Sequence, residues 1–293
     1  MLPKNLENSV LKLLENHTGE IYTINHISSV SGGSINNALK IDCGKKNFFL
    51  KWNHAKQLPS MFEKEAKGMK LLYETGEIYV PEVIGIDENP EYGMILLEFV
   101  QQQKPGNEFW NVFGTQLGKL HKNHCGKLFG LDHDNFIGSL KQFNTFHSNW
   151  IDFFILQRLE IQLKMAINSG LLNKSDYKSF ENLYRRLDDF FPVENPSLLH
   201  GDLWSGNFMV NHRGEPSIFD PAVYYGHRII DIGMTKLFGG FSDEFYRAYN
   251  QEYPLENNWK ESVEIANLYP LLVHVNLFGF GYVSSVRSVI KKF

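Results

Sequence analysis

The sequence predicts an α+β chain of two lobes, and a change of periodicity near residue 100 is the main reason. Residues 1–100 carry β-rich runs separated by glycine-containing breaks, which predict a small N-terminal lobe with a five-stranded antiparallel sheet and one main helix. Residues 101–293 show mostly helical spacing, which predicts a larger helical C-terminal lobe. A hydrophobic fraction of 43% is ample for packed cores in a chain of 293 residues.

The N-terminal lobe is predicted element by element. A first helix is expected to end near Gly19, after which the stretch 21–52 changes period and predicts three antiparallel strands separated by "SGGS" and "CGKK". The segment 60–78 places apolar residues among charges at helical spacing, so one helix follows the strands. Residues 80–86 and 93–100 then predict two further strands, which complete the sheet.

The stretch "QQQKPGN" at residues 101–107 indicates a boundary between lobes, because proline and glycine disfavour continuation of the preceding strand. Beyond it, helical spacing is broken only by "LLHGDLWSGNFMV" at 198–210, which resembles a buried strand pair, and by "PSIFD" at 216–220. A short hairpin within a helical lobe is therefore expected. A cleft between the lobes is the natural place for a ligand.

Composition excludes several classes of partner. Lysine and arginine number 29 against 33 aspartate and glutamate, a net charge of −4 without long runs of one sign, which argues against nucleic acid. Cys43 and Cys125 lack metal-binding or disulfide spacing, and this favours a reducing cytoplasm. The N-terminus lacks the profile of a signal peptide, and no apolar run approaches the length of a membrane span, roughly 18 residues. The expected partner is a small molecule, whereas the oligomeric state is not indicated.

The most specific pattern consists of His200, Asp202 and Asn207, followed by Asp220 at the end of another apolar run. The spacing His-x-Asp-x4-Asn arises by chance in roughly one chain in thirty of this length. The motif alone is therefore weak evidence for a functional site, and its position in the chain carries more weight. Both segments lie at loop ends beside apolar strands, where two carboxylates and an amide could converge. Such hard oxygen ligands suit Mg²⁺, and phosphoryl transfer is the chemistry that uses this set.

In that scheme Asp202 accepts the proton of the attacking hydroxyl, while Asn207 and Asp220 hold the magnesium ion on the phosphates of a nucleotide. The alternative is that Asp202 caps a turn, Asn207 fills a loop and Asp220 ends a strand. The contents of the N-terminal lobe weigh against this alternative. Residues 1–100 are accordingly expected to bind the nucleotide, and residues 101–293 to supply catalysis and the substrate site.

Lys51 lies within the apolar strand "FFLKW" and needs an anionic partner. Glu65 and Glu63 on the following helix are rivals, separated by about 200° around the helix axis. Glu65 is the predicted partner because Met69 and Leu72, at i+4 and i+7, lie on its side. The pair would direct the ammonium toward the nucleotide phosphates. A solubilising charge on an edge strand is the alternative.

Two further segments are candidates for nucleotide contact. Gly32, Gly33 and Ser34 lie in "SGGS", where glycines let backbone N–H groups approach phosphate oxygens, although a plain hairpin turn explains them equally well. The segment matches neither G-x-G-x-x-G nor the Walker pattern, which disfavours a P-loop NTPase.

"LLEFV" at 96–100 is the second segment, because it ends the small sheet at the junction between the lobes. If adenine binds there, the backbone carbonyl of Glu98 and the amide of Val100 are the expected contacts, with Leu97 behind the ring. Because the expected hydrogen bonds involve backbone atoms, the side chains of this segment do not prove them.

Together these elements resemble the protein-kinase-like fold. "HGDLWSGN" followed by "DPAVYYGHR" is more specific and resembles the fructosamine kinase (ketosamine-3-kinase) family, related to the aminoglycoside and choline phosphotransferases. The resemblance extends over nearly the whole chain through the blocks "FGLDHDNFIGSLKQFN", "NWIDFFILQRLEIQL", "TKLFGGF" and "LYPLLVHVNLFGFGY". One departure is Ile229, where the family commonly carries an acidic residue.

The resemblance implies an enzyme that uses ATP and Mg²⁺ to phosphorylate the C3 hydroxyl of a ketosamine, free or protein-bound. Because the product carries phosphate next to a carbonyl carbon, it eliminates readily and frees the amine, which amounts to deglycation. Two alternatives remain: an enzyme of the same fold acting on an aminoglycoside, choline or another hydroxyl compound, and a nucleotide-binding protein without catalysis.

Three residues are candidates for substrate contact. Trp204, two residues from the proposed base, could offer a flat face to the sugar or its amine substituent, or could pack against the helical lobe. His274 and Asn276 could reach the substrate, or could form a hydrogen bond between helices. His200 is expected to orient the catalytic loop rather than transfer a proton, and Asp231 to anchor that loop.

Overall fold

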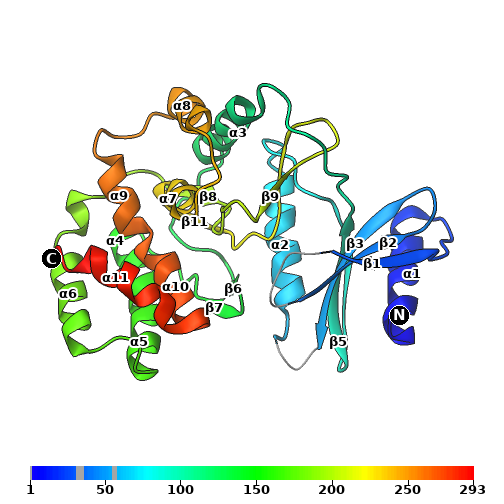
Figure 1. The fold of residues 1–293 in the computed structure, drawn as a ribbon, viewed down its shortest axis with the longest axis horizontal. Coiled ribbons are helices and arrows are strands. Elements are labelled where there is room, and N and C mark those ends of the chain that lie inside the picture. The colour runs from blue at the N-terminus through cyan, green and yellow to red at the C-terminus, as the bar shows by residue number, and fades with distance from the viewer. Residues whose placement is uncertain (1, 31–35, 55–57) are drawn as a thin grey trace. The chain divides into compact units, whose positions relative to one another are not determined.

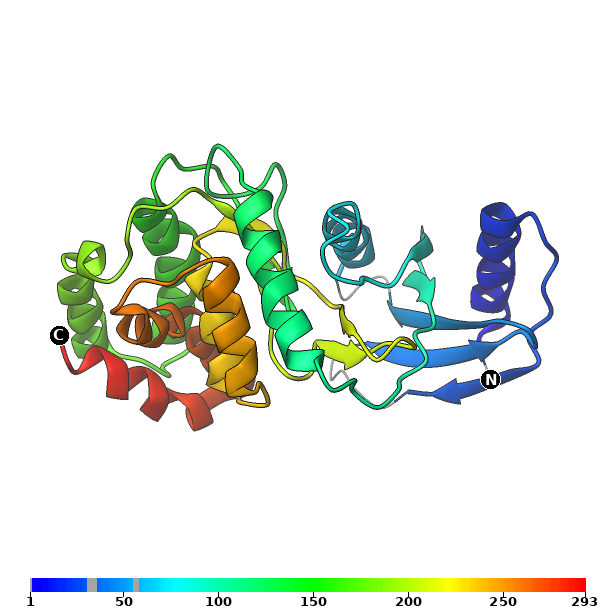
Figure 2. The same ribbon diagram turned by 90° about the horizontal axis from the view of Figure 1, so that it is seen from above.

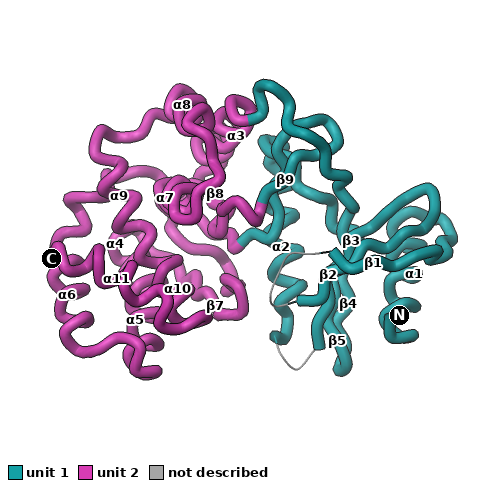
Figure 3. Tube along the Cα trace, in the orientation of Figure 1, with its two compact units in different colours: residues 1–109, 208–221 teal, residues 110–207, 222–293 magenta. Residues whose placement is uncertain are grey.

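A computed structural model describes residues 2–30, 36–54 and 58–293, and Figures 1 and 2 show its elements from two directions. The chain divides into two compact units (Figure 3): Met1–Phe109 with Phe208–Pro221, and Trp110–Asn207 with Ala222–Phe293. A segment from late in the chain therefore belongs to the N-terminal unit. The lobes 1–100 and 101–293 remain predictions based on the sequence.

The first unit contains a five-stranded sheet in which every neighbouring pair is antiparallel, as the sequence predicts (Figure 1). Its spatial order is β1-β2-β3-β5-β4. The strands are β1 (His26–Ser29), β2 (Asn37–Asp42), β3 (Asn47–His54), β4 (Val83–Glu88) and β5 (Tyr92–Glu98).

Helices cover both faces of this sheet. Side chains alternate along β3, so neighbouring residues on this strand face different helices. Phe48 and Leu50 face the core formed with helix α1 (Lys4–Thr18), whereas Lys51 points to the opposite face and contacts helix α2 (Met61–Tyr73). Figure 1 shows the two helices on either side of the strands. The helix ending near Gly19 is confirmed, although the sequence pattern did not assign it a place on the sheet.

The hairpin of β9 (Phe208–Val210) and β10 (Pro216–Ile218) is attached to the first unit by backbone hydrogen bonds. The N–H of Ile218 donates to the carbonyl of Tyr79 at 3.0 Å, and the N–H of Gln103 donates to the carbonyl of Val210 at 3.2 Å. Asp220, which follows β10, therefore belongs to the same unit as Lys51.

The second unit is mostly helical, as predicted. Its helices are α3 (Phe109–Asn123), α4 (Trp150–Phe153), the π-helical segment Phe154–Leu159, α5 (Glu160–Asn168), α6 (Lys174–Tyr184), α7 (Ile229–Leu237), α8 (Asp243–Glu252), α9 (Trp259–Ala266), α10 (Leu268–Phe278) and α11 (Val283–Ile290), with 3₁₀ turns at Leu187–Asp189 and Gly279–Tyr282.

The short strands beyond residue 130 differ from the expectation. The apolar pairs that flank the polar motif do not pair with each other, because β8 (Ser197–Leu199) pairs with β11 (Tyr224–Gly226) while β9 pairs with β10. A further hairpin, β6 (Asn135–Ile137) with β7 (Leu140–Gln142), was not predicted. Three-residue strands are too short to show a period of two, so the sequence pattern could not reveal them.

The C-terminal helical run Trp259–Ile290 is long and apolar enough, by length and composition alone, to cross a membrane. Its most apolar window is 61% buried inside the chain, and the core helix of a soluble protein passes the same test. This run is therefore weak evidence for a membrane span. The prediction of no membrane partner stays a prediction.

Helices α3 and α8 approach closely where Gly114 faces α8, and Figure 2 shows α3 in green beside α8 in orange. A Cβ at Gly114 would lie 2.1 Å from the carbonyl oxygen of Phe245.

We expect Gly114→Ala to lower the free energy of unfolding by about 1–3 kcal/mol through overpacking, although alanine is the better helix former. Urea denaturation measures this. Gly281→Ala is the control, since a Cβ there meets nothing within 4 Å. Equal stability of both variants would contradict the prediction.

Candidate active site

A buried ammonium group joins three segments of the first unit. The Nζ atom of Lys51 lies 2.8 Å from Oε1 of Glu65 and 2.9 Å from Oδ1 of Asp220. Lys51 and Glu65 are both buried, whereas Glu63 forms an ion pair with Lys67 at 2.6 Å on the exposed face of α2. The contact between Lys51 and Glu65, predicted from helical spacing, is therefore present. Their role in binding a nucleotide stays a prediction.

Electrostatics keep this group charged. Burial alone would lower the pKa of Lys51, but the carboxylates of Asp220 and Glu65 outweigh it and raise that pKa above its ordinary value. Burial raises the pKa of Glu65, and the ammonium of Lys51 opposes that rise. Lys51 is thus a permanent cation held by two carboxylates, and such a cation suits an anionic ligand.

Asp220 adopts a backbone conformation that is uncommon for its residue type. Its φ of 54° lies in the left-handed region, which among the described non-glycine residues is shared only with Ser60. A left-handed non-glycine residue costs about 1–3 kcal/mol and persists only where its surroundings enforce it. The contacts of Asp220 include the ion pair with Lys51, and the paired strand β10 precedes it.

Asp202 and Asn207 lie together in a loop of the second unit. The Nδ2 atom of Asn207 donates to the backbone carbonyl of Asp202 at 2.9 Å and to its carboxylate oxygen Oδ2 at 3.0 Å. Asn207 is buried, while Asp202 is partly exposed. Because the amide nitrogen donates to Asp202, the carbonyl oxygen of Asn207 is the atom that a cation could bind.

The predicted magnesium ligands have suitable chemistry. The amide oxygen of Asn207 and the carboxylate of Asp220 are the hard oxygen donors that Mg²⁺ prefers, and magnesium sites commonly combine one or two such ligands with phosphates and water. No group of three or more His, Cys, Asp or Glu residues arranged to hold a metal occurs within the described part of the chain. Asn207 and Asp220 belong to different units, so their convergence on one ion remains a prediction.

The loop that carries Asp202 is anchored by a buried carboxylate. Oδ2 of Asp231 accepts the N–H of His200 at 2.7 Å, and its Oδ1 accepts the N–H of Gly201 at 2.9 Å. His121 Nε2 lies 3.2 Å from Oδ2 of the same carboxylate, and its Nδ1 lies 2.9 Å from the hydroxyl of Tyr249. Burial would raise the pKa of Asp231, but the hydrogen bond and charge of His121 and the contacts with His200 and Gly201 lower it. The predicted anchoring contact of Asp231 is present; His121 was missed, because a histidine within an amphipathic helix gives no signal.

His200 is buried, and its Nδ1 accepts the N–H of Asp202 at 3.3 Å. Its backbone carbonyl accepts the N–H of Ala222 at 2.9 Å. Gly201, with a φ of 82°, has no room for a side chain, since a Cβ would lie 2.1 Å from the carbonyl oxygen of Ala222. These contacts fit the orienting role expected for His200.

Trp204 and His274 lie in one aromatic group. The Trp204 ring is 37% exposed and its centroid lies 6.0 Å from that of Phe238, which in turn lies 5.0 Å from the ring of His274. His274 Nδ1 donates to the carbonyl of Pro270 at 2.7 Å. Burial lowers the pKa of His274, so its imidazole is neutral near pH 7. The rings of Trp204, Phe238 and His274 therefore form a partly exposed, uncharged group, and Trp204 lies two residues after Asp202 in the sequence.

Asn276 is placed differently. Its Nδ2 donates to the backbone carbonyl of Gln162 at 2.9 Å and to Oε1 of Gln162 at 2.8 Å. This is the hydrogen bond between helices, here α10 and α5, that the sequence left as the alternative. Contact of Asn276 with substrate remains a prediction.

The other predicted nucleotide-binding residues are described in part. Leu97 and Val100 are buried at the end of β5 and just beyond it. The N–H of Glu98 donates to the carbonyl of Glu82 at 2.9 Å, and the Glu98 carboxylate accepts the hydroxyl of Tyr79. The adenine contacts stay a prediction. Gly32, Gly33 and Ser34 lie outside the described residues.

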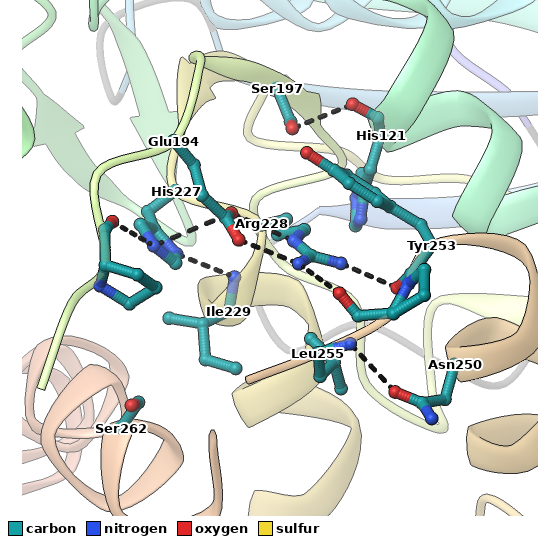
Figure 4. Close-up of polar contacts among 12 residues, drawn as sticks. His121, Glu194, Ser197, His227, Arg228, Ile229, Asn250, Tyr253, Leu255 and Ser262 are labelled. Atoms are coloured by element: carbon teal, nitrogen blue, oxygen red, sulfur yellow. Dashed lines mark hydrogen bonds and ion pairs between the residues drawn. The ribbon is translucent and has the colours of Figure 1, made fainter. Parts of the chain in front are cut away.

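A second polar cluster lies where α7 begins (Figure 4). The Arg228 guanidinium makes two bonds to Glu194, at 2.9 and 2.7 Å, and donates to the carbonyl of Tyr253 at 2.7 Å. His227 lies beside it, and its Nδ1 accepts the N–H of Ile229 at 3.3 Å. Ile229 is buried as the first residue of α7.

A model of the fructosamine kinase family matches residues 6–293 of this sequence. The chain belongs to the fructosamine kinase family. A relative named a probable ketoamine kinase, from Vibrio parahaemolyticus, is 39% identical over 274 residues, which cover 92% of this chain and 93% of the relative. The chloroplastic protein-ribulosamine 3-kinase of Arabidopsis thaliana is 39% identical over 277 residues, covering 93% of this chain and 83% of that protein.

Solved structures agree with this assignment. A fructosamine-3-kinase candidate from Haemophilus somnus superposes with a TM-score of 0.88 at 29% identity, covering 97% of this chain and 96% of that one. An amicoumacin kinase in complex with AMP-PNP superposes with a TM-score of 0.64 at 15% identity, covering 99% and 93% of the two chains. At that identity the similarity shows the fold alone. The chain thus has the protein-kinase-like fold that the sequence predicts.

The cluster of Figure 4 predicts a pH dependence of stability. His227 Nε2 donates to the carbonyl of Pro192 and Nδ1 accepts the N–H of Ile229, so a second proton would break the latter bond. Burial lowers the pKa of His227 to about 4, and Glu194 only partly opposes this. The unfolded chain binds this proton below about pH 6.5 and the folded chain does not until about 4. The free energy of unfolding should therefore fall by about 3 kcal/mol as pH falls through this window.

Urea denaturation between pH 7 and pH 4.5 measures the dependence. His227→Asn, which keeps an acceptor for Ile229, should flatten the curve in this range, whereas His54→Gln on the exposed end of β3 should leave it unchanged. Identical curves for the His227→Asn variant and the original protein would refute the assignment.

Proposed function

We propose that this protein is an ATP-dependent kinase that phosphorylates the C3 hydroxyl of a ketosamine and thereby promotes deglycation. The observation that carries the phosphotransfer part is the buried Lys51, held by Glu65 on α2 and by Asp220 after β10. A cation on a sheet, paired with a helix carboxylate and close to a potential metal ligand, is the arrangement used to position nucleotide phosphates in kinases.

Each residue has a distinct task in this proposal. Lys51 binds the α- and β-phosphates of ATP, and Asn207 and Asp220 would hold Mg²⁺, which supplies charge neutralisation on the phosphates when bound. Asp202 accepts the proton of the substrate hydroxyl as that oxygen attacks the γ-phosphorus. Its partial exposure lets a substrate reach it, while the contacts of His200, Gly201 and Asn207 hold its loop.

The acceptor class is inferred from the relatives. Their names describe ketoamine kinases and a protein-ribulosamine 3-kinase, so a sugar ketosamine is the acceptor that fits, free or attached to a protein. The half-exposed ring of Trp204 and the neutral ring of His274 offer apolar faces for the sugar or for the substituent on its amine. The relatives include bacterial proteins and a chloroplastic one, and for this chain we propose the cytoplasm.

Asp202→Asn tests the assignment of the base. The amide cannot accept the proton, so kcat should fall by about 10² to 10⁴ while the affinity for Mg·ATP is preserved. Coupled measurement of ADP release gives kcat, and calorimetric titration with a non-hydrolysable ATP analogue gives the affinity. Asp132→Asn is the control, because the Asp132 side chain is 81% exposed. Unchanged turnover in Asp202→Asn would show that another group takes the proton.

The acceptor is tested with a panel of free ribulosamines, erythrulosamines and fructosamines, with an aminoglycoside and choline as competitors for the assignment. We expect ATP consumption with at least one ketosamine, and phosphorus NMR should locate the new phosphate on C3. Turnover confined to the aminoglycoside or to choline would overturn the proposed acceptor class. ATP consumption with none of these compounds would contradict the proposed function as a whole.

A further inference from the structure

Five polar side chains form a continuous buried network in the second unit, separate from the residues assigned above. They come from the hairpin β6–β7, the residues after it, the π-helical segment and α10, and their exposed fractions do not exceed 4%: Asn135, Gln142, Asn144, Arg158 and Tyr269. Buried polar groups destabilise a fold unless they are bonded to one another. A cluster of this size therefore requires a reason.

The bonds run without interruption from one end to the other. Arg158 Nη2 donates to Oδ1 of Asn144 at 2.7 Å, and Asn144 Nδ2 donates to Oδ1 of Asn135 at 2.9 Å. Gln142 Nε2 donates to the same oxygen of Asn135 at 2.8 Å. The hydroxyl of Tyr269 donates to Oε1 of Gln142 at 2.7 Å. Gln142 thus has partners on both its amide nitrogen and its amide oxygen.

The network ends on backbone carbonyls rather than on further side chains. Gln142 Nε2 also donates to the carbonyl of Ala222 at 3.0 Å, and Asn135 Nδ2 donates to the carbonyl of Val223 at 2.8 Å. Ala222 is the residue whose N–H donates to the carbonyl of His200 and against whose carbonyl Gly201 packs without space for a Cβ. Asp202 directly follows Gly201 in the sequence. The network therefore reaches the catalytic loop through a single intermediate residue.

Arg158 shows that the network is costly to maintain. It is fully buried, donates to the carbonyls of Phe143 and Gln157, and lies with its guanidinium carbon 3.9 Å from the centroid of the Tyr224 ring. Its interactions in the described part of the chain include no carboxylate partner. Burying a charge without an ion pair carries a large desolvation penalty, so an apolar residue would stabilise a merely structural core at least as well.

We propose that Gln142 is a positioning residue for Asp202. It fixes the carbonyl of Ala222, and Ala222 in turn fixes His200 and Gly201. Asp231 holds the N–H groups of His200 and Gly201, whereas the Gln142 network holds the carbonyl side of the same loop. Asp202 is thereby oriented from two directions. This inference rests on the proposed role of Asp202 as the base.

The test replaces Gln142 and separates positioning from folding. Gln142→Leu removes both amide bonds, and Gln142→Met keeps the length of the side chain but has no N–H for the carbonyl of Ala222. We expect both variants to lower kcat by about 10- to 100-fold, the effect of a small misplacement of a catalytic group, with KM for ATP changed less than about twofold. Tyr269→Phe leaves the donor to Ala222 in place and should lower kcat by less than about threefold.

Ser262→Ala is the matched control, because Ser262 is also buried and its hydroxyl donates to a backbone carbonyl, that of Phe190. It should lower Tm without lowering kcat. A kcat within about twofold of the original in either folded Gln142 variant would overturn the proposal, as would a loss of kcat in Ser262→Ala equal to that in Gln142→Leu. If Gln142→Leu does not fold, Gln142→Met allows the same comparison.

Failure of the proposed function is recognised separately. It appears as absence of ketosamine turnover in the unmodified protein, before any variant is compared. In that case the same variants are compared with whichever acceptor the panel identifies, or by ATP hydrolysis with water as acceptor. The positioning role of Gln142 is then judged by the same kcat criterion.

Discussion

The ammonium group of Lys51 joins segments that are far apart in the sequence. It lies on β3, contacts Glu65 of α2 fourteen residues later, and contacts Asp220 at a separation of 169 residues. An unpaired cation in this buried position would be strongly destabilising, and the two carboxylates compensate its charge. In the proposed function the same cation provides the positive charge that a triphosphate needs. Stability and the proposed phosphate binding would then depend on one group.

The second unit holds the loop that carries Asp202 by a different means. There the partners of the loop are mostly backbone atoms: N–H groups of His200 and Gly201 bound by Asp231, and a carbonyl of His200 bound by Ala222. Backbone contacts fix the path of the loop. Asn207 contacts the carboxylate of Asp202 directly. If Asp202 is the base, as proposed, this support would hold its carboxylate in place for proton transfer.

Much of this could be predicted from the sequence where a local period carried the signal. Alternation identified the five strands, and helical spacing chose Glu65 over Glu63 as the partner of Lys51. Spacing also brought Asp202 and Asn207 to one loop. The grouping of residues 208–221 with the N-terminal unit could not be predicted, because it depends on backbone bonds to Tyr79 and Gln103, which leave no mark on residue type. The positions of His121, Gln142 and Arg158 likewise follow from tertiary contacts alone.

The left-handed backbone of Asp220 restricts which residues this position can accept. Aspartate and asparagine enter that region with the least strain among residues that carry a Cβ, whereas β-branched side chains are strongly disfavoured there. An alanine or valine at 220 would therefore alter the course of the chain after β10 as well as removing the carboxylate that contacts Lys51. Glycine would relieve the strain but would also loosen the chain, so asparagine is the one exchange that isolates the charge of the side chain from the shape of the backbone.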